Sequence, residues 1–196
     1  MTKRRNTREL LVDEGVTAFL ARGYEGVGIQ QILAGVGVPK GSFYNHFASK
    51  EDFAREVIDA YERRYEMFVT DCFSGDAAPL EQLRDYFARL EEQMRDAGAS
   101  AGCLYGVLSQ TSAPHSEVLR ECLKQAFARW RANLIKLLEA ARAAGDLTFA
   151  TDIGSLADAI IDSYEGALVR MRAEGSIAPV SRFRAVTLER LLGAAG

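Results

Sequence analysis

A cluster of polar side chains near the start of the chain has the chemistry needed to contact DNA. Its side chains can donate hydrogen bonds to base edges or phosphates, and Gly41 allows the backbone to come close to the DNA. The cluster consists of Lys40, Gly41, Ser42, Tyr44, Asn45 and His46. Val38, Phe43 and Phe47 are interspersed at helical spacing, so we expect them to face inward. The pattern therefore predicts a short helix over residues 40–47 with one polar and one apolar face.

The segments around this cluster have the arrangement of a helix-turn-helix. Helices are predicted over residues 6–22, 29–35, 40–47 and 49–72. Asn6 and Glu9 have the spacing of a capping box at the start of the first helix, and Ser49 and Asp52 occupy similar places at the last. The turn Gly37-Val38-Pro39 separates the two short helices, because glycine accepts a positive φ and proline begins a helix readily. In such a motif the second short helix presents its side chains to the bases in the major groove.

The rest of the chain also reads as helices, without the period-two pattern of a strand. Further helices are predicted over residues 79–96, 103–112, 115–144, 152–174 and 181–193, with breaks at glycines and prolines. The expected fold class is therefore all-α, with about nine helices. We divide the chain into a DNA-binding helix-turn-helix domain over residues 1–50 and a larger helical domain over residues 51–196.

The charge of the chain is divided between these two parts. The net charge is −3, yet residues 1–50 hold seven Lys or Arg residues against four Asp or Glu. A basic head on an acidic body indicates that only the head meets a polyanion such as DNA. No apolar run is long enough to cross a membrane, and the start of the sequence has no secretory apolar stretch. We therefore expect a cytoplasmic protein with no membrane contact.

The three cysteines, Cys72, Cys103 and Cys122, are widely spaced and include no Cys-x-x-Cys pair. Because His46 and His115 are the only histidines, this spacing argues against a zinc site. We expect thiols in a reducing cytoplasm, no bound metal and no cofactor. An enzyme with Cys103 as nucleophile is an alternative hypothesis, although neither histidine lies where a catalytic base is needed. A helical protein–protein adaptor is another alternative, and it leaves the basic head unexplained.

The order of residues from the first helix to the start of the long helix resembles the tetracycline-repressor (TetR/AcrR) family. The resemblance covers about residues 6–60 and rests on Gly23-Tyr24-Glu25, Ile32-Leu33, the run from Gly37 to Phe47, and Ser49-Lys50-Glu51-Asp52. It implies a DNA-binding transcriptional repressor, not an enzyme. Such a repressor binds a palindromic double-stranded operator as a homodimer and is released by a small-molecule effector.

The resemblance also implies which residues contact DNA. They are Gln30, Lys40, Gly41, Ser42, Tyr44, Asn45, His46 and Lys50. Phosphate contacts are implied for Tyr44, His46 and Lys50, with Lys50 at the positive end of the long helix, while the remaining residues choose the base sequence and His46 can also reach a base. Gly28 departs from the family, which usually carries Thr or Ser there. Glycine can cap the second helix but offers no hydroxyl to a phosphate.

For the larger domain, the resemblance implies a dimer interface and an effector site. The interface is implied to be a four-helix bundle of residues 152–174 and 181–193 from both subunits. Its apolar residues would be Leu156, Ile160, Tyr164, Ala167, Leu168 and Met171, with Phe183, Val186, Leu188, Leu191 and Leu192. The effector site would be lined by Cys103, Leu104, Tyr105, Leu108, Phe127, Trp130 and Tyr164. Ordinary core packing is the alternative for most of these residues.

Cys103 stands at the start of a predicted helix, a position that favours the thiolate. The stretches Gly102-Cys103-Leu104 and Tyr164-Glu165-Gly166-Ala167 resemble a branch containing the N-ethylmaleimide- and acrylate-responsive repressors. This resemblance implies that the cysteine senses electrophiles or oxidants. The alternative is a small buried residue that fills space between two helices.

Overall fold

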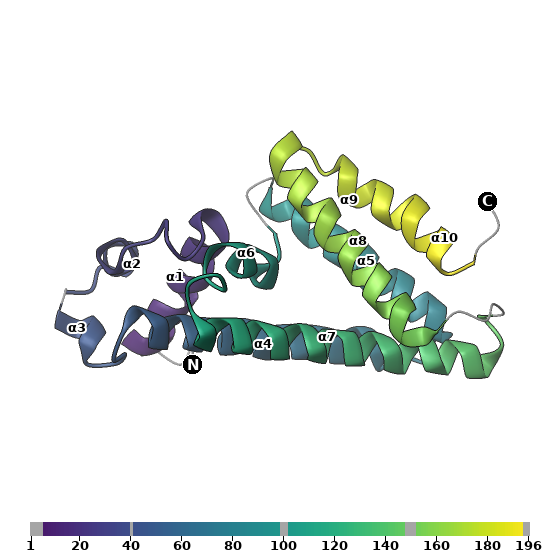
Figure 1. Cartoon of the computed structure of the whole chain (residues 1–196), viewed down its shortest axis with the longest axis horizontal. Helices are drawn as coiled ribbons and strands as arrows, with labels where there is room; N and C mark the ends of the chain where they lie inside the picture. The colour runs from purple at the N-terminus through teal and green to yellow at the C-terminus, as the bar shows by residue number, and fades with distance from the viewer. Residues whose placement is uncertain (1–5, 40, 99–101, 148–151, 194–196) are drawn as a thin grey trace, which may run out of the picture. The chain divides into compact units, whose positions relative to one another are not determined.

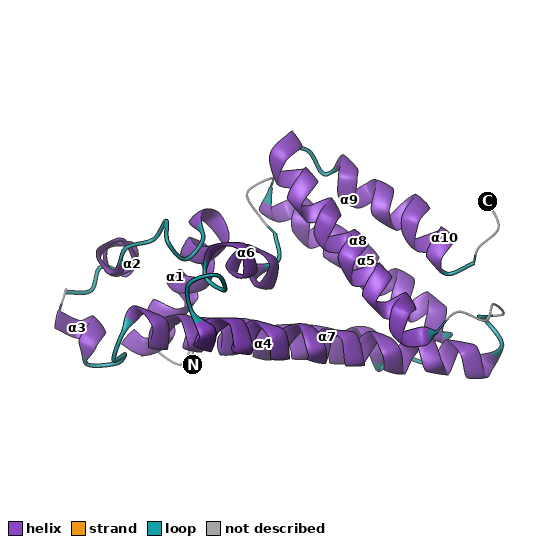
Figure 2. Cartoon of the chain, viewed as in Figure 1, coloured by secondary structure: helices purple, strands orange, loops and turns teal. Residues whose placement is uncertain are grey.

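The computed structural model describes residues 6–39, 41–98, 102–147 and 152–193. The regular elements in these ranges are helices, which confirms the all-α prediction (Figure 1; Figure 2). They are α1 (Thr7–Arg22), α2 (Ile29–Val36), α3 (Gly41–Tyr44), α4 (Lys50–Phe73), α5 (Pro79–Ala97), α6 (Leu104–Thr111), α7 (Glu117–Ala144), α8 (Ile153–Glu174), α9 (Ala178–Arg182), a π-helical segment (Phe183–Leu188) and α10 (Glu189–Leu191). The last three elements are continuous, and we call residues 178–191 the terminal helix.

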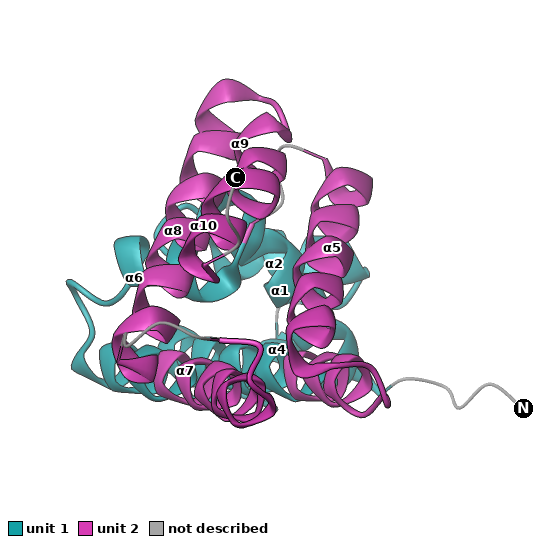
Figure 3. Ribbon diagram, turned by 90° about the vertical axis from the view of Figure 1, so that its right-hand side faces the viewer, with its two compact units in different colours: residues 1–64, 103–126 teal, residues 65–102, 127–196 magenta. Residues whose placement is uncertain are grey.

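The helices form two compact units, which Figure 3 distinguishes by colour. Unit 1 consists of Met1–Arg64 and Cys103–Ala126, and unit 2 of Tyr65–Gly102 and Phe127–Gly196. Helices α4 and α7 each contribute their first part to unit 1 and their last part to unit 2. The predicted domain boundary between residues 50 and 51 lies inside unit 1, and the division into a DNA-binding and a larger helical domain stays a prediction.

Unit 1 is built around an aromatic core. The ring centroids of Phe43 and Phe47 are 5.2 Å apart, and the ring of Phe53 in α4 packs edge-on against them at 5.3 and 4.9 Å. Phe19 of α1 lies 5.9 Å from Phe53. These four side chains are at most 2% exposed, and edge-to-face contacts add to the stabilisation that burial provides. The core therefore fixes the segment around α3 against α1 and α4.

Gly15 allows α1 to approach α4 closely. A Cβ at this position would lie 2.5 Å from Phe53 Cζ and 2.6 Å from Val57 Cγ2, well inside van der Waals contact. Nearer the start of α1, Arg8 forms an ion pair with Glu56 of α4 at 2.7 Å. The close crossing of α1 and α4 thus depends on having glycine at position 15 as well as on the aromatic core.

Unit 2 has a second aromatic core, which joins α5, α8 and the terminal helix. The ring of Phe87 in α5 lies 5.3 Å from that of Tyr164 in α8 and 5.1 Å from that of Phe183 in the terminal helix. Tyr86 packs against Phe87 at 4.8 Å, and its hydroxyl lies 2.7 Å from the hydroxyl of Tyr65 in α4. The core therefore includes hydrogen-bonded phenols as well as hydrocarbon.

Most residues predicted to form the dimer interface are instead buried within unit 2. The buried residues are Leu156, Ile160, Tyr164, Ala167, Leu168, Met171, Phe183, Leu188 and Leu192. Leu191 is half-buried, whereas Val186 is 41% exposed and Val169 of α8 is 50% exposed. The apolar stripes of the two helices are therefore used to build the unit itself, and Val169 and Val186 lie outside these buried stripes.

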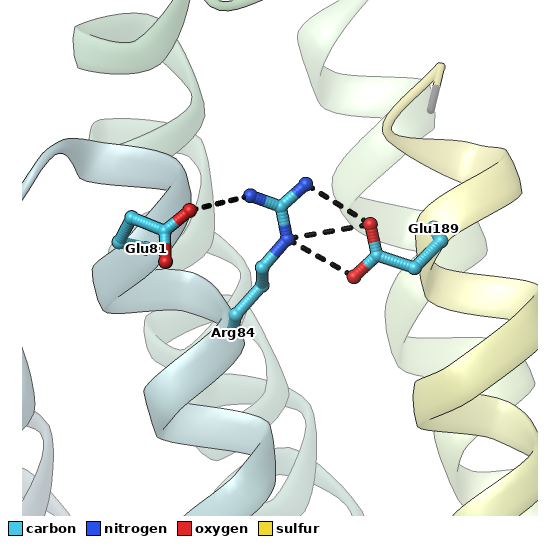
Figure 4. A network of polar contacts seen from close by, with 3 residues as sticks. All are labelled: Glu81, Arg84 and Glu189. Atoms are coloured by element: carbon cyan, nitrogen blue, oxygen red, sulfur yellow. Dashed lines mark hydrogen bonds and ion pairs between the residues drawn. The ribbon is translucent and has the colours of Figure 1, made fainter. Parts of the chain in front are cut away.

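An ion pair fastens the terminal helix to α5. The Nε and Nη2 atoms of Arg84 each lie 3.0 Å from a carboxylate oxygen of Glu189, and Nη1 donates to Glu81 at 2.8 Å (Figure 4). The fork of the guanidinium matches the two oxygens of a carboxylate, which gives such a pair a defined geometry. Arg84 therefore holds the last turn of the terminal helix in register with α5.

A second polar contact fixes the beginning of the same helix. Glu91 of α5 is 4% exposed, and its carboxylate accepts hydrogen bonds from Ser181 and Arg184 at 2.5 Å and from Arg95 at 2.8 Å. Burial raises the pKa of Glu91, but the hydrogen bonds from Ser181 and Arg184 and the charges of Arg184 and Arg95 outweigh it and leave the pKa below its ordinary value. Glu91 is therefore a buried carboxylate held in its charged form.

Three structural observations concern membrane-spanning helices, metal sites and disulfides. In the described part of the chain, no helix has the length and apolar character needed to cross a membrane. Across the same residues, His, Cys, Asp and Glu side chains form no group of three or more that could hold a metal ion. Cys72, Cys103 and Cys122 all lie within the described ranges and form no disulfide with one another.

Candidate DNA-binding surface and effector residues

The predicted recognition segment is anchored by its phenylalanines and directs its polar side chains outward. Phe43 and Phe47 belong to the aromatic core of unit 1, whereas Tyr44, between them in sequence, is 61% exposed. The remaining described residues of the predicted site in this segment are Gly41, Asn45 and His46, which are exposed, and Ser42, which is half-buried. The segment therefore has a rigid apolar anchor and a polar outer surface.

The recognition helix is shorter than the predicted range 40–47. Helix α3 ends at Tyr44, and the N–H groups of His46 and Phe47 donate to the carbonyl of Phe43 at 2.9 and 3.0 Å. Phe47 is buried in the aromatic core. Two residues later, the Oγ of Ser49 accepts a hydrogen bond from the N–H of Asp52, the third residue of α4, so the chain passes from α3 to the start of α4 within a few residues. Lys40, predicted to begin this helix, lies outside the described residues.

Helix α2 begins at a glycine cap and exposes Gln30. The N–H of Gly28 donates to Oε1 of Gln31 at 2.9 Å, and the carbonyl of Gly28 accepts from the N–H of Gln31 at 3.0 Å. Ile32 and Leu33 are buried below, while Gln30 is exposed. The helix therefore starts without a hydroxyl at Gly28: the Gly28 carbonyl accepts from the N–H of Gln31, and the Gln31 side chain accepts from the N–H of Gly28.

Lys50, the first residue of α4, is held by a residue of the turn that follows α1. Its Nζ donates to the main-chain carbonyl of Tyr24 at 2.6 Å and lies 4.2 Å from the centroid of the Tyr24 ring. Burial lowers the pKa of Lys50, and the negative charge of Glu25 partly opposes this. An ammonium group has three N–H donors, so the contact with the Tyr24 carbonyl uses one of them.

Four of the predicted effector residues lie in unit 1. Cys103 is the N-cap residue of α6 and is half-buried. Leu104, Tyr105 and Leu108 of α6 are at most 2% exposed, and the ring of Tyr105 packs edge-on against that of Tyr61 in α4 at 5.2 Å. Core packing, the alternative considered for these three residues, describes the surroundings found for them.

The other three predicted effector residues lie together in unit 2. The rings of Phe127 and Trp130 are stacked 6.0 Å apart, and Tyr164 meets Trp130 edge-on at 6.1 Å. Trp130 is 3% exposed, and among the described residues its indole Nε1 has no hydrogen-bond partner. A buried indole N–H usually has an acceptor. Among these three residues, Trp130 therefore has a buried hydrogen-bond donor without an acceptor in the described part of the chain.

Two contacts of Tyr24 were not predicted from the sequence: one with Thr111 and one with Lys50. Thr111 ends α6, and its Oγ1 accepts a hydrogen bond from the N–H of Tyr24 at 3.1 Å. A threonine at the end of a helix carries no signal that separates such a contact from an exposed position. Tyr24 belongs to the residues that carry the family resemblance, but nothing in the spacing shows that its carbonyl meets Lys50.

Comparison with known proteins places both parts of the chain in one family. Residues 11–57 match the family described as "Bacterial regulatory proteins, tetR family", and residues 79–187 match "Tetracyclin repressor-like, C-terminal domain". The HTH-type transcriptional repressor DhaR of Mycobacterium sp. (strain GP1) is 34% identical over 94% of this chain and 92% of its own length. The HTH-type transcriptional repressor NemR of Escherichia coli (strain K12) is 29% identical over 89% of this chain and 88% of its own.

Solved structures show the same fold over nearly the whole chain. The regulatory protein TetR from Rhodobacter sphaeroides has a TM-score of 0.86 and 32% identity, with 94% of this chain and 95% of that chain covered. A cysteine mutant of the TetR family regulator CifR, solved with a 26bp double-strand operator DNA, has a TM-score of 0.81 over 100% of both chains. At 22% identity, this second likeness concerns the fold alone. The chain therefore belongs to the TetR family of helix-turn-helix transcriptional regulators.

Proposed function

We propose that this chain is a homodimeric repressor that binds a palindromic operator through unit 1 and leaves it when an effector binds. The observation that carries the proposal is the exposure of Gly41, Tyr44, Asn45 and His46 beside the buried rings of Phe43 and Phe47. Such an arrangement suits a recognition segment, because the anchor fixes the position of side chains that must meet base edges. The relatives DhaR and NemR are both named repressors, which favours repression over activation.

The proposed contacts divide into those that choose a sequence and those that hold the DNA backbone. Sequence choice is assigned to Gln30, Lys40, Gly41, Ser42 and Asn45. The exposed hydroxyl of Tyr44, the imidazole of His46 and the ammonium of Lys50 are assigned to phosphates, and His46 can also reach a base. The CifR mutant was solved with operator DNA, the same class of partner.

We place the dimer interface on the outer faces of α8 and the terminal helix. Val169 and Val186 are among the exposed large apolar side chains, and a Cβ added at Gly166 would have no atom within 4 Å. Gly166 and Val169 are three residues apart and so share one face of α8. Arg84 and Glu91 stabilise the position of this surface, because they hold the two ends of the terminal helix against α5.

We place the effector contact at Trp130, whose buried N–H fits a ligand that carries a hydrogen-bond acceptor. The effector must bind the released state more tightly than the DNA-bound state, since otherwise it cannot shift the equilibrium. An electrophile is the second candidate, favoured by the N-cap position of Cys103. In that reaction the thiolate sulfur forms a bond to an electrophilic alkene carbon, and the displaced π electrons take up a proton at the neighbouring carbon.

The proposed contacts can be tested by titrating the full chain into labelled duplex DNA from upstream of its own gene and measuring fluorescence anisotropy. Tyr44→Phe should weaken binding to every sequence, whereas Asn45→Ala should alter which bases are preferred, by about 1–3 kcal/mol at the contacted pair. Asn133→Ala, in unit 2, serves as the matched control and should leave binding unchanged. If Tyr44→Phe and Asn45→Ala bind every sequence as the unaltered chain does, the recognition surface is assigned wrongly.

A further inference from the structure

The last residue of α6 and the connection from α6 to α7 each make one hydrogen bond to a residue near the start of α4, all within unit 1. Oγ1 of Thr111 accepts from the N–H of Tyr24 at 3.1 Å, and Oγ of Ser116 donates to Oε1 of Glu51 at 2.6 Å. The Thr111 hydroxyl donates its own proton to the carbonyl of Val107 at 2.9 Å. Both its donor and an acceptor position are therefore used, which fixes the orientation in which it holds Tyr24.

The same Tyr24 residue contacts Lys50 on its other side. Its carbonyl accepts from Lys50 Nζ at 2.6 Å, and its ring lies below the ammonium at 4.2 Å. Gly23 brings this turn onto α6: its φ is 70°, and a Cβ there would lie 2.7 Å from Cγ2 of Thr111. A continuous set of contacts thus leads from the last turn of α6 through Tyr24 to the ammonium of Lys50.

We propose that Thr111 is a positioning residue for DNA binding, which acts through the main chain of Tyr24 to aim the ammonium of Lys50 at a phosphate. The inference rests on the proposed function of unit 1 as the DNA-binding unit. Tyr24 uses one of the three donors of the ammonium and thereby restricts the directions of the other two. The N-terminus of α4 adds the positive end of a helix dipole at the same place, which favours a phosphate oxygen there.

A purely structural role for Thr111 would have a different consequence. It would change the stability of unit 1 and weaken binding whether or not Lys50 is present. A positioning role makes the two residues non-additive, because Thr111 has nothing left to aim once the ammonium is removed. A double-mutant cycle separates these cases.

The cycle consists of Thr111→Val, Lys50→Met and the double variant, each titrated as the full chain into upstream duplex DNA at several salt concentrations. Thr111→Val removes the hydroxyl and should weaken binding about three- to tenfold, while Thr111→Ser should restore it. Lys50→Met should weaken binding and reduce the slope of log K against log salt by about 0.9 for each subunit. In the Lys50→Met background, Thr111→Val should cause no further loss.

Thr70→Val is the matched control, since Thr70 also donates to the carbonyl four residues before it but is exposed; it should bind DNA normally. Thr111→Ala, which also removes the hydroxyl that accepts from the Tyr24 N–H, provides a second cycle with Lys50→Met if Thr111→Val does not fold. An unaltered chain that binds no upstream DNA refutes the proposed function itself. The positioning role is overturned if the unaltered chain binds DNA and the loss caused by Thr111→Val or Thr111→Ala is absent, or is equal with and without Lys50→Met.

Discussion

Replacing Glu91 with glutamine should loosen the terminal helix from α5 and lower the free energy of unfolding. The substitution keeps the size of the side chain but replaces one carboxylate oxygen by an NH2 group. Ser181 can still donate to the remaining oxygen. The Nε–H of Arg184, which now donates to Oε2 at 2.5 Å, would then face another donor.

The size of the effect follows from the exposure of the partners. The Glu91 side chain is 6% exposed, while those of Arg184 and Arg95 are 43% and 60% exposed. A hydrogen bond to a charged group contributes about 1.5–3 kcal/mol, and the partly exposed Arg184 places the expected loss near the lower half of that range, at about 2 kcal/mol. Arg95→Ala should cost less, about 0.5 kcal/mol, because an exposed pair is screened by solvent.

Urea unfolding followed by tryptophan fluorescence measures this difference directly. Trp130 is the only tryptophan of the chain and is buried in unit 2 with Glu91, so its emission reports on the affected unit. All variants are compared at one protein concentration, since association also contributes to stability. Glu92→Gln, at the exposed neighbouring position, is the matched control and should unfold as the unaltered chain does.

The difference in unfolding free energy between the unaltered chain and Glu91→Gln should also depend on pH. Hydrogen bonds and positive charges hold the pKa of Glu91 in the folded chain below its ordinary value. Its stabilising contribution is therefore complete above the ordinary glutamate pKa of about 4.3 and is lost as the pH falls through the lower folded-state pKa. The difference between the unaltered chain and Glu91→Gln should shrink over that acid range. Equal stability of Glu91→Gln and Glu92→Gln at neutral pH would refute this reasoning.

Three further substitutions test other parts of the structure. Gly15→Ala places a Cβ against Phe53 and should lower the free energy of unfolding by about 1–3 kcal/mol; an unchanged thermal midpoint would contradict the close approach of α1 to α4. Val169→Glu should give a monomer by light scattering after gel filtration, whereas Val118→Glu, at an exposed position of unit 1, should not, and equal masses would move the interface elsewhere. Cys103→Ser should abolish release of DNA by N-ethylmaleimide, while Cys122→Ser should not; release that persists in Cys103→Ser rules out this thiol as the sensor.

The features that the sequence predicted well depend on residues close together in the chain. The capping box at α1 is present, with the N–H of Glu9 donating to Asn6 Oδ1 at 2.8 Å and the N–H of Asn6 donating to Glu9 Oε2 at 3.2 Å. At α4 the N–H of Asp52 donates to Ser49 Oγ at 3.0 Å. Such contacts span three residues, so a sequence pattern contains both partners. Helix boundaries were therefore predictable to within a few residues.

The contacts that the sequence did not predict join distant segments. Glu91 meets Ser181 and Arg184 only because α5 and the terminal helix pack together, and nothing near Glu91 in sequence other than Arg95 marks it as a buried charge. Periodicity identified the apolar side of α8, but it could not tell whether that side faces its own unit or a second subunit. The same limit applies to the predicted effector residues. The sequence gives their side-chain types, but it does not show that four of them lie in unit 1 and three in unit 2.

Thr111 shows the limit most clearly. Thr70 and Thr111 both donate to the carbonyl four residues earlier in a helix, so they are alike in their local structure. Only the hydroxyl of Thr111 also accepts a hydrogen bond from the N–H of Tyr24. The packing of α1 against α6 brings Tyr24 to this position. A role that depends on tertiary contact cannot be read from helical propensity or spacing.

The most direct test of the central claim is the affinity of the unaltered chain for the duplex upstream of its own gene, measured as a function of salt concentration. The phosphate contacts proposed for the two subunits of the proposed dimer should make log K fall linearly with log salt, by about 0.9 for each phosphate neutralised. We expect tight binding at low salt, a steep loss as salt rises, and a clear preference over unrelated duplex DNA. Binding that is undetectable on upstream DNA, or that does not change with salt, would contradict the assignment of unit 1 as an operator-binding head.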